Sequence, residues 1–182
     1  MMLSRTVFIV TLASAAVSQA ERLGKSSKSK SDQKTNVYGK PLSKCSQTGM
    51  ALTGFTRTGR CVEEKDDEGS HHICIDLSSE SLNGKNFCEV TKQDDWCDSK
   101  MECDDGGSDK KCPVEHWCVC QWAFEGYLEK AGGCDSIQEI DCEATNNEAI
   151  LAYQADEEEH GEALACLKKR CNLDGAVVVA TE

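Results

Sequence analysis

The most regular hydrophobic pattern lies in the middle of the chain. Apolar residues recur there at spacings of three and four, as on the buried face of an α-helix, until Gly132-Gly133 stops the pattern. The residues that carry the pattern are Trp117, Cys120, Phe124, Tyr127, Leu128 and Ala131. The spacing predicts a central core helix built on the Trp117-Cys118-Val119-Cys120 segment. Aromatic residues at this spacing usually fill a core, so the pattern alone indicates no cofactor.

Upstream of this helix the pattern favours short extended segments. Glycines interrupt short apolar pieces throughout residues 45–74, which is typical of strands joined by tight turns. Residues 73–77 alternate and are the best strand candidate. Residues 88–112 combine Asp, Gly and four cysteines without periodicity. We expect them to form an irregular insertion that only disulfides or a metal would order.

The C-terminal third predicts one strand and two helices. The strand covers residues 137–142, and either Thr145 or Asn146 caps a helix over residues 148–154. A last helix over 157–170 begins with acidic residues and ends with basic ones, as the helix dipole favours. Gly161 inside it costs about 1 kcal/mol. The whole pattern predicts an α+β fold: one small domain with short strands, the central Trp-Cys-x-Cys helix and C-terminal helices.

The chain ends differ in composition from this domain. Residues 1–20 have a basic start at Arg5, an apolar run over 7–17 and a small-x-small cleavage site ending at Ala20, which predicts a secretory signal peptide. Residues 21–35 form a Lys/Ser-rich segment, which we expect to be a flexible basic arm. The cysteine-rich domain then spans 36–174, followed by a tail over 175–182. We therefore expect a secreted protein, or one of the secretory-pathway lumen, without a membrane anchor after cleavage.

Charge is distributed unevenly along the chain. Residues 21–44 carry seven Lys or Arg against two acidic residues, whereas residues 45–182 carry twelve basic against thirty acidic ones. The total formal charge is −12. An acidic body repels nucleic acid and anionic lipid, so we expect neither as a partner. The simplest consequence of this acidic body is solubility.

Thirteen cysteines follow the predicted signal peptide, at positions 45, 61, 74, 88, 97, 103, 112, 118, 120, 134, 142, 166 and 171. In an oxidising lumen, thiols within reach of one another pair. Because the count is odd, one thiol either stays free or forms an intermolecular disulfide. The cysteines predict a domain stapled by disulfides, but their spacing leaves the connectivity open.

A set of short motifs occurs in order along most of residues 36–155. These are Asn36-Val37-x-Gly39 with Leu42, Cys45-Ser46, Thr53-Gly54-Phe55-x-Arg57-x-Gly59-x-Cys61, Asp67-x-Gly69-x-His71-x-Ile73-Cys74, Trp117-Cys118-Val119-Cys120 and Glu143-Ala144-Thr145. Together they resemble the domain of unknown function 2237 family, which is largely bacterial and uncharacterised. The resemblance implies a small α+β domain with no established activity.

The chain departs from that family pattern in three respects. Family members usually carry a Gly-Asn-Asp-Leu-Ser-Thr-Pro segment and a Phe-Pro-Gly-Leu segment, and residues 88–112 replace both. The His that follows Glu-Ala-Thr in the family is Asn146 here. Eight of the cysteines fall outside the family positions, which are 45, 61, 74, 118 and 120. The resemblance therefore implies up to four disulfides added on secretion, beside an older group of five.

Three kinds of chemistry are open to the older cysteines. They can be structural, as two disulfides and one free thiol. They can bind zinc, with candidate ligands Cys45, Cys61, Cys74, His71, Cys118 and Cys120, although no Cys-x-x-Cys spacing is present. They can also exchange disulfides, with Cys118, Cys120 and His71 as candidate catalytic residues.

The sequence defines neither substrate nor cofactor. No Gly-x-Ser-x-Gly elbow and no nucleotide-binding glycine loop occurs in the chain. Of the histidines, we expect His72 and His116 to lie on the surface. The prediction is a disulfide-stabilised binding or structural module without catalysis, with a thiol-disulfide redox protein or a zinc-binding protein as the alternatives.

Overall fold

The computed structural model describes residues 35–93, 95–105 and 109–173. At its centre, strand β1 (Ile73–Asp76) pairs antiparallel with β4 (His116–Val119) on one side and with β5 (Glu139–Ile140) on the other. Successive side chains of a strand point to opposite faces. Ile73 and Ile75 accordingly enter the main hydrophobic core, whereas Cys74 enters a second, cysteine-lined cluster.

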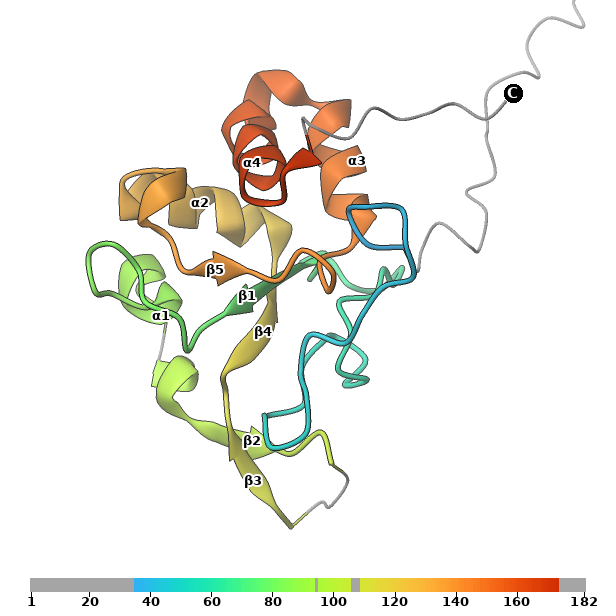
Figure 1. Ribbon diagram of the computed structural model, residues 1–182, viewed down its shortest axis with the longest axis vertical. Coiled ribbons are helices and arrows are strands. Elements are labelled where there is room, and N and C mark those ends of the chain that lie inside the picture. Colours follow the sequence, from blue (N-terminus) through green and yellow to red (C-terminus); the bar gives the residue numbers. More distant parts are fainter. Residues whose placement is uncertain (1–34, 94, 106–108, 174–182) are drawn as a thin grey trace, which may run out of the picture.

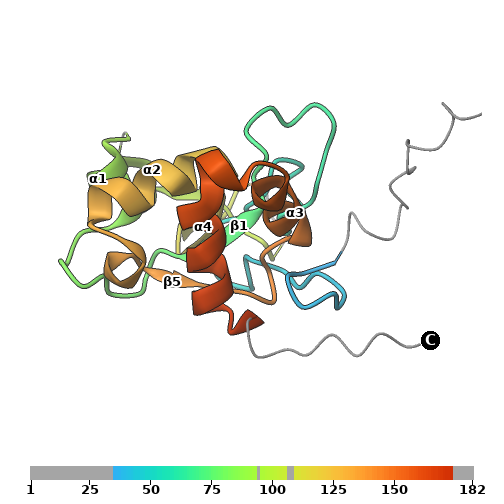
Figure 2. The same cartoon turned by 90° about the horizontal axis from the view of Figure 1, so that it is seen from above.

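Three helices cover the end of this sheet. They are α2 (Gln121–Ala131), α3 (Asn147–Ala155) and α4 (Glu157–Arg170), and α4 packs against both of the others. Figure 1 shows them above the sheet, and the view from above in Figure 2 places α4 across β1, between α2 and α3. The mixture of helices and short antiparallel strands confirms the predicted α+β fold.

The insertion over residues 88–112 is more regular than predicted. It contains most of α1 (Phe87–Thr91), the 3-10 helix η2 (Asp95–Asp98), strand β2 (Lys100–Glu102) and the start of β3 (Lys111–Pro113). Disulfides 88–97 and 103–112 each close a short loop within it, as expected. The hairpin of β2 and β3 lies at the end of the molecule away from the helices (Figure 1).

The central helix begins later than predicted. Trp117, Cys118 and Val119 belong to strand β4, where they face Ile75, Cys74 and Ile73 of β1, and α2 begins only at Gln121. Pairing with β1 satisfies the backbone groups of this segment, and that long-range gain overrides the helical spacing. Gly132 and Gly133, both with positive φ, end the helix as predicted.

The C-terminal elements follow the prediction closely. Helix α4 begins and ends at the predicted residues, and Asn146 rather than Thr145 caps α3 by accepting a hydrogen bond from the Glu148 amide at 3.0 Å. Strand β5 is limited to two residues. A short 3-10 helix, η3 (Cys134–Ser136), connects α2 to it.

Six disulfides staple the fold, and all thirteen cysteines lie within the described ranges. The pairs are 45–74, 61–118, 88–97, 103–112, 134–166 and 142–171, and Cys120 is free. The eight cysteines outside the family positions pair only with one another. This number of disulfides is typical of an oxidising compartment, either extracellular or in the secretory pathway.

Several predictions concern residues that are not described. The signal peptide, the basic arm apart from Thr35, and the tail lie outside the described ranges, so they and the domain boundaries stay predictions. No helix within those ranges is both long and apolar enough to cross a bilayer.

Two buried tyrosines link stability to alkaline pH. Burial raises the pKa of Tyr127, and burial, together with the nearby Glu125 and Cys120, raises the pKa of Tyr153. An unfolded tyrosine loses its proton near pH 10, so above that pH the unfolded chain binds fewer protons than the folded one and stability falls. We expect the guanidinium midpoint to decrease between pH 9 and pH 11, and to decrease less in Tyr153→Phe. An equal decrease in both proteins would contradict this account.

Candidate functional site

A cavity of about 240 Å³ opens between the sheet, α2 and the insertion. Its apolar walls come from α1, η2, β2, β4 and α2. The other lining residues come from the segments before β1 and after α1, from β4 and from the N-cap of α2. The apolar residues are Phe87, Trp96, Met101, Trp117, Val119 and Ala123, and the others are His71, Gln93, Cys118 and Cys120. The cavity therefore brings together all three candidate catalytic residues, Cys118, Cys120 and His71.

The walls are an aromatic cluster. The rings of Trp96 and Trp117 lie 5.4 Å apart between centroids, and Phe87 contacts Trp96 at 6.0 Å. Phe87 in turn meets Tyr127 of α2 edge-on at 4.9 Å. Because Tyr127 and Phe87 are almost completely buried, the cluster is anchored in the core. These rings form a rigid apolar surface that suits a planar ligand.

Arg57 lies over the ring of Trp117, with its guanidinium carbon 5.1 Å from the ring centroid. The loop that carries it makes a tight turn at Gly54, whose φ is +86° and where a Cβ would collide with the backbone oxygen of Arg60. Only glycine fits this position. The loop thereby holds a cation against the Trp117 ring, and this cation–π contact is attractive.

Cys120 directly follows the last residue of strand β4 and occupies the N-cap position of α2. Its side chain makes no capping hydrogen bond, and the residue is partly exposed. Its neighbour Cys118 is buried and bonded to Cys61. The Cys-x-Cys motif is therefore not a dithiol in this structure, and Cys120 alone carries a thiol in the cavity.

His71 is held from one side by Asp67. The Asp67 carboxylate accepts the His71 backbone amide at 2.9 Å, and its other oxygen lies 2.7 Å from His71 Nδ1. The Asp67 side chain is 1% exposed. A carboxylate on Nδ1 fixes the ring orientation and leaves Nε2 as the acceptor in the neutral imidazole.

The glycine between these two residues has a packing role. A Cβ on Gly69 would come within 2.5 Å of His71 Cε1, so the imidazole lies directly against the glycine. Phe55 also stacks on this imidazole, at 6.4 Å between centroids and 16° between planes. The Asp67-x-Gly69-x-His71 motif therefore positions one imidazole.

A backbone hydrogen bond ties His71 to Cys120. The Gln121 amide donates to the Ser70 carbonyl at 3.1 Å, and these two residues directly follow Cys120 and precede His71. The thiol and the imidazole therefore lie on chain segments that are hydrogen-bonded to each other at the cavity. A thiol, an imidazole and a buried carboxylate are the groups of a nucleophilic site.

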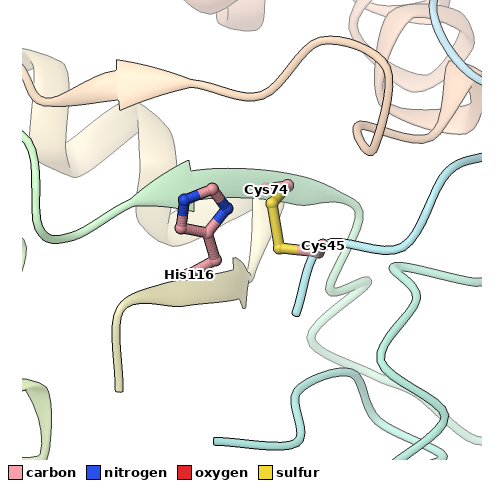
Figure 3. A group of neighbouring side chains, drawn as sticks. All are labelled: Cys45, Cys74 and His116. Carbon is pink, nitrogen blue, oxygen red and sulfur yellow. A yellow bond between two sulfur atoms is a disulfide. The ribbon is translucent and has the colours of Figure 1, made fainter. Parts of the chain in front are cut away.

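The other candidate zinc ligands are bonded to one another. Cys45 and Cys61 form disulfides with Cys74 and Cys118, and a disulfide sulfur is not the thiolate that zinc requires. Figure 3 shows His116 beside the Cys45–Cys74 disulfide, where the three ligand atoms lie within 4.8 Å of one another. That proximity includes the covalent S–S bond. A zinc site of these residues would need a reduced protein.

Several features of the site were missed from the sequence. Trp96 and Met101 come from the insertion that we expected to be irregular, and Asp67 was not singled out, although it lies four residues before His71. The expectation for His72 was wrong. His72 is 3% exposed. Its Nδ1 lies 2.7 Å from Gln121 Oε1 and its Nε2 lies 2.6 Å from Glu63 Oε2, so both ring nitrogens have polar neighbours inside the fold. His116 is only 14% exposed at its side chain, so it is not a surface residue either.

Comparison with known proteins resolves the family. The profile of the family described as uncharacterized protein conserved in bacteria, DUF2237, matches residues 35–160. The chain belongs to this family. None of the curated proteins matches the chain. The match confirms the resemblance inferred from the ordered motifs.

Many of the motif residues that this DUF2237 chain shares with its family have structural roles. Thr53 accepts the amide of Cys118 at 2.8 Å, and Thr145 accepts the amide of Cys74 at 3.1 Å. Asn146, at the family's histidine position, donates to the Cys61 carbonyl at 2.9 Å. His71 and Cys120 are different, because both line the cavity, and Asp67 and Gly69 contact the His71 ring.

Proposed function

We propose that this protein is a binding module whose ligand is a small planar apolar molecule seated in the aromatic cavity. The observation that carries the proposal is the pair of tryptophan walls, Trp96 and Trp117, anchored by Phe87 to the core. An apolar cavity of about 150 Å³ is known to bind benzene. At about 240 Å³, this cavity has room for a ligand of one or two rings.

The polar groups of the cavity support the same function. Ligand sites are mainly apolar with a few placed polar groups that orient the ligand. His71 and Gln93 supply such groups here, and Arg57 backs the Trp117 ring. A dithiol redox reaction and a zinc site have less support, because Cys118 is bonded to Cys61.

The binding test is calorimetric titration of the protein with indole. For a ligand of this size we expect a dissociation constant of about 0.1–1 mM. Trp117→Ala is expected to weaken binding at least about tenfold, because it removes a wall and its stacking surface. Cyclohexanol, which is apolar but not planar, should bind more weakly than indole.

Trp122→Ala is the matched control. Trp122 is 41% exposed and does not line the cavity, so its removal should leave indole binding unchanged. Absence of saturable binding, or equal weakening by both tryptophan substitutions, would contradict the proposal.

A further inference from the structure

We propose that Cys120 is the nucleophile of a thiol-disulfide exchange site, in which His71 accepts its proton and the cavity holds a small disulfide that carries an apolar ring. The product is a mixed disulfide between Cys120 and half of the ligand. This inference rests on the proposed binding function, because the ring of the ligand would occupy the aromatic cavity.

The free thiol lies at the cavity and not elsewhere in the fold. Twelve of the thirteen cysteines are consumed in disulfides, and the remaining one lies partly exposed in a cavity. A merely leftover thiol would be expected to be buried and inert or to lie on open surface. Here Cys120 lines the same cavity as His71, and the bond from Gln121 to Ser70 joins their chain segments.

Asp67 orients the imidazole that serves as the base. Asp67 uses both carboxylate oxygens on His71, one on the backbone amide and one on Nδ1. The other ring nitrogen, Nε2, is then the proton acceptor. A nucleophile, a base and a buried carboxylate that orients the base make up the general arrangement of an activated thiol. Asp67 acts through His71, so it is a positioning residue.

Cys120 also lies at the start of α2. The N-terminal end of a helix carries partial positive charge, which favours the negative charge on an attacking sulfur. Cys120 is the N-cap residue of this eleven-residue helix, and its side chain makes no capping hydrogen bond. The sulfur is therefore not engaged by the helix end that it faces.

The exchange is balanced without a further cofactor. The Cys120 thiol gives its proton to His71 Nε2, and the sulfur attacks one sulfur of the ligand R–S–S–R. The ligand's S–S bond breaks as the Cys120–S–S–R bond forms, and the electron pair leaves with R–S⁻, which takes the proton back from His71. Cys120 is oxidised, and the departing half of the ligand is reduced.

The surroundings favour a small ligand and a stable adduct. A cavity of about 240 Å³ with aromatic walls admits a ring but not a folded partner protein. Cys118, two residues away, is held by Cys61 and cannot resolve the mixed disulfide as a free thiol. Release of the captured half would need a second small thiol from solution. The site is therefore a single-thiol capture site.

The test uses the native oxidised protein with 4,4′-dithiodipyridine, an aromatic disulfide that releases an ultraviolet-absorbing thione. We expect one equivalent to be released per chain by wild type and none by Cys120→Ser. His71→Gln should slow the release at least about tenfold at neutral pH and change its pH dependence. Asp67→Asn should also slow the release and change its pH dependence, because it removes the group that orients His71.

Two further variants complete the test in case His71→Gln fails to fold. His116→Gln is the control, because His116 also pairs with a carboxylate, Asp76, at 3.5 Å but does not line the cavity. Its rate should stay within about twofold of wild type. Gly69→Ala keeps the imidazole but displaces it, and should slow the exchange as well. A wild-type rate in a folded His71→Gln protein, or modification of Cys120 only after denaturation, would overturn the inference.

Ring recognition is tested separately with 2-hydroxyethyl disulfide. Each rate is divided by the rate of the same reagent with glutathione, which removes intrinsic reactivity. Wild type should prefer the aromatic reagent at least about tenfold, and Trp117→Ala should lose this preference. Equal normalised rates in wild type, or a disulfide-linked protein dimer in place of the mixed disulfide, would also overturn the inference.

Indole binding by Cys120→Ser separates the two proposals. If this variant binds indole while wild type shows no exchange, the binding function stands and the inference fails. If neither protein binds indole, the binding function fails, whatever the exchange rate.

Discussion

Removal of the Cys61–Cys118 disulfide is expected to lower the free energy of unfolding by about 4 kcal/mol. The bond closes a loop of 57 residues between the N-terminal loops and β4, and loop-closure entropy gives about this value for that length. Both cysteines are almost completely buried. The double variant Cys61→Ala/Cys118→Ala replaces both, so no unpaired thiol is left beside Cys120. Guanidinium unfolding followed by circular dichroism measures the loss.

The matched control is Cys103→Ala/Cys112→Ala. This disulfide is also buried, but it closes a loop of only 9 residues, so its loss should cost about 2.6 kcal/mol. A long-loop variant that costs no more than the short-loop one would contradict the entropic account. It would show instead that local packing around each bond determines its contribution.

The second large effect is expected at Gln138, which connects three parts of the fold. Its side chain accepts the Phe87 amide at 2.8 Å and donates to the carbonyls of Leu77 and Ser79 at 2.7 and 2.9 Å. Gln138 is 2% exposed. Gln138→Leu keeps most of the volume but leaves three backbone groups without their partner. We expect a loss of about 3–5 kcal/mol by denaturant unfolding.

Gln154→Leu provides the comparison for this substitution. Gln154 is exposed on α3, so the same change there should alter stability by no more than about 0.5 kcal/mol. If Gln138→Leu cost less than about 1 kcal/mol, water would have to replace the lost hydrogen bonds. Because Phe87 lines the cavity, Gln138→Leu is also expected to weaken indole binding.

Both effects bear on how the cavity is built. The Cys61–Cys118 bond fixes the strand that carries Trp117, and Gln138 fixes the start of the helix that carries Phe87. The walls of the cavity therefore depend on two long-range connections rather than on one element. Binding by this protein should be lost in steps as these connections are removed.

Local signals in the sequence predict the C-terminal half of the fold well. The acidic start and basic end of α4, the Asn146 cap of α3 and the glycines after α2 each act within a few residues. The two strand residues Ile73 and Ile75 are recognised in the same way, from alternation alone. Such signals need no knowledge of the partner surface.

The odd cysteine count and the family motifs predict more than local structure. Together they imply two groups of cysteines, five on family positions and eight outside, and the six disulfides respect that division. His71 and Cys120 were also candidates before the structure was known. The sequence did not relate them to Asp67.

Only the tertiary structure decided the remaining points, because each depends on groups far apart in the chain. Trp117 lies in a strand because β1, about 40 residues earlier in the chain, supplies the hydrogen-bond partners of its backbone. The helical spacing of its neighbours gives no sign of that pairing. Cys120 is the free thiol because Cys118 lies against Cys61, 57 residues earlier. The cavity exists because the insertion brings Trp96 to Trp117. Local sequence determined the bounds of α4 and the end of α2, and long-range pairing determined where α2 begins and which side chains meet.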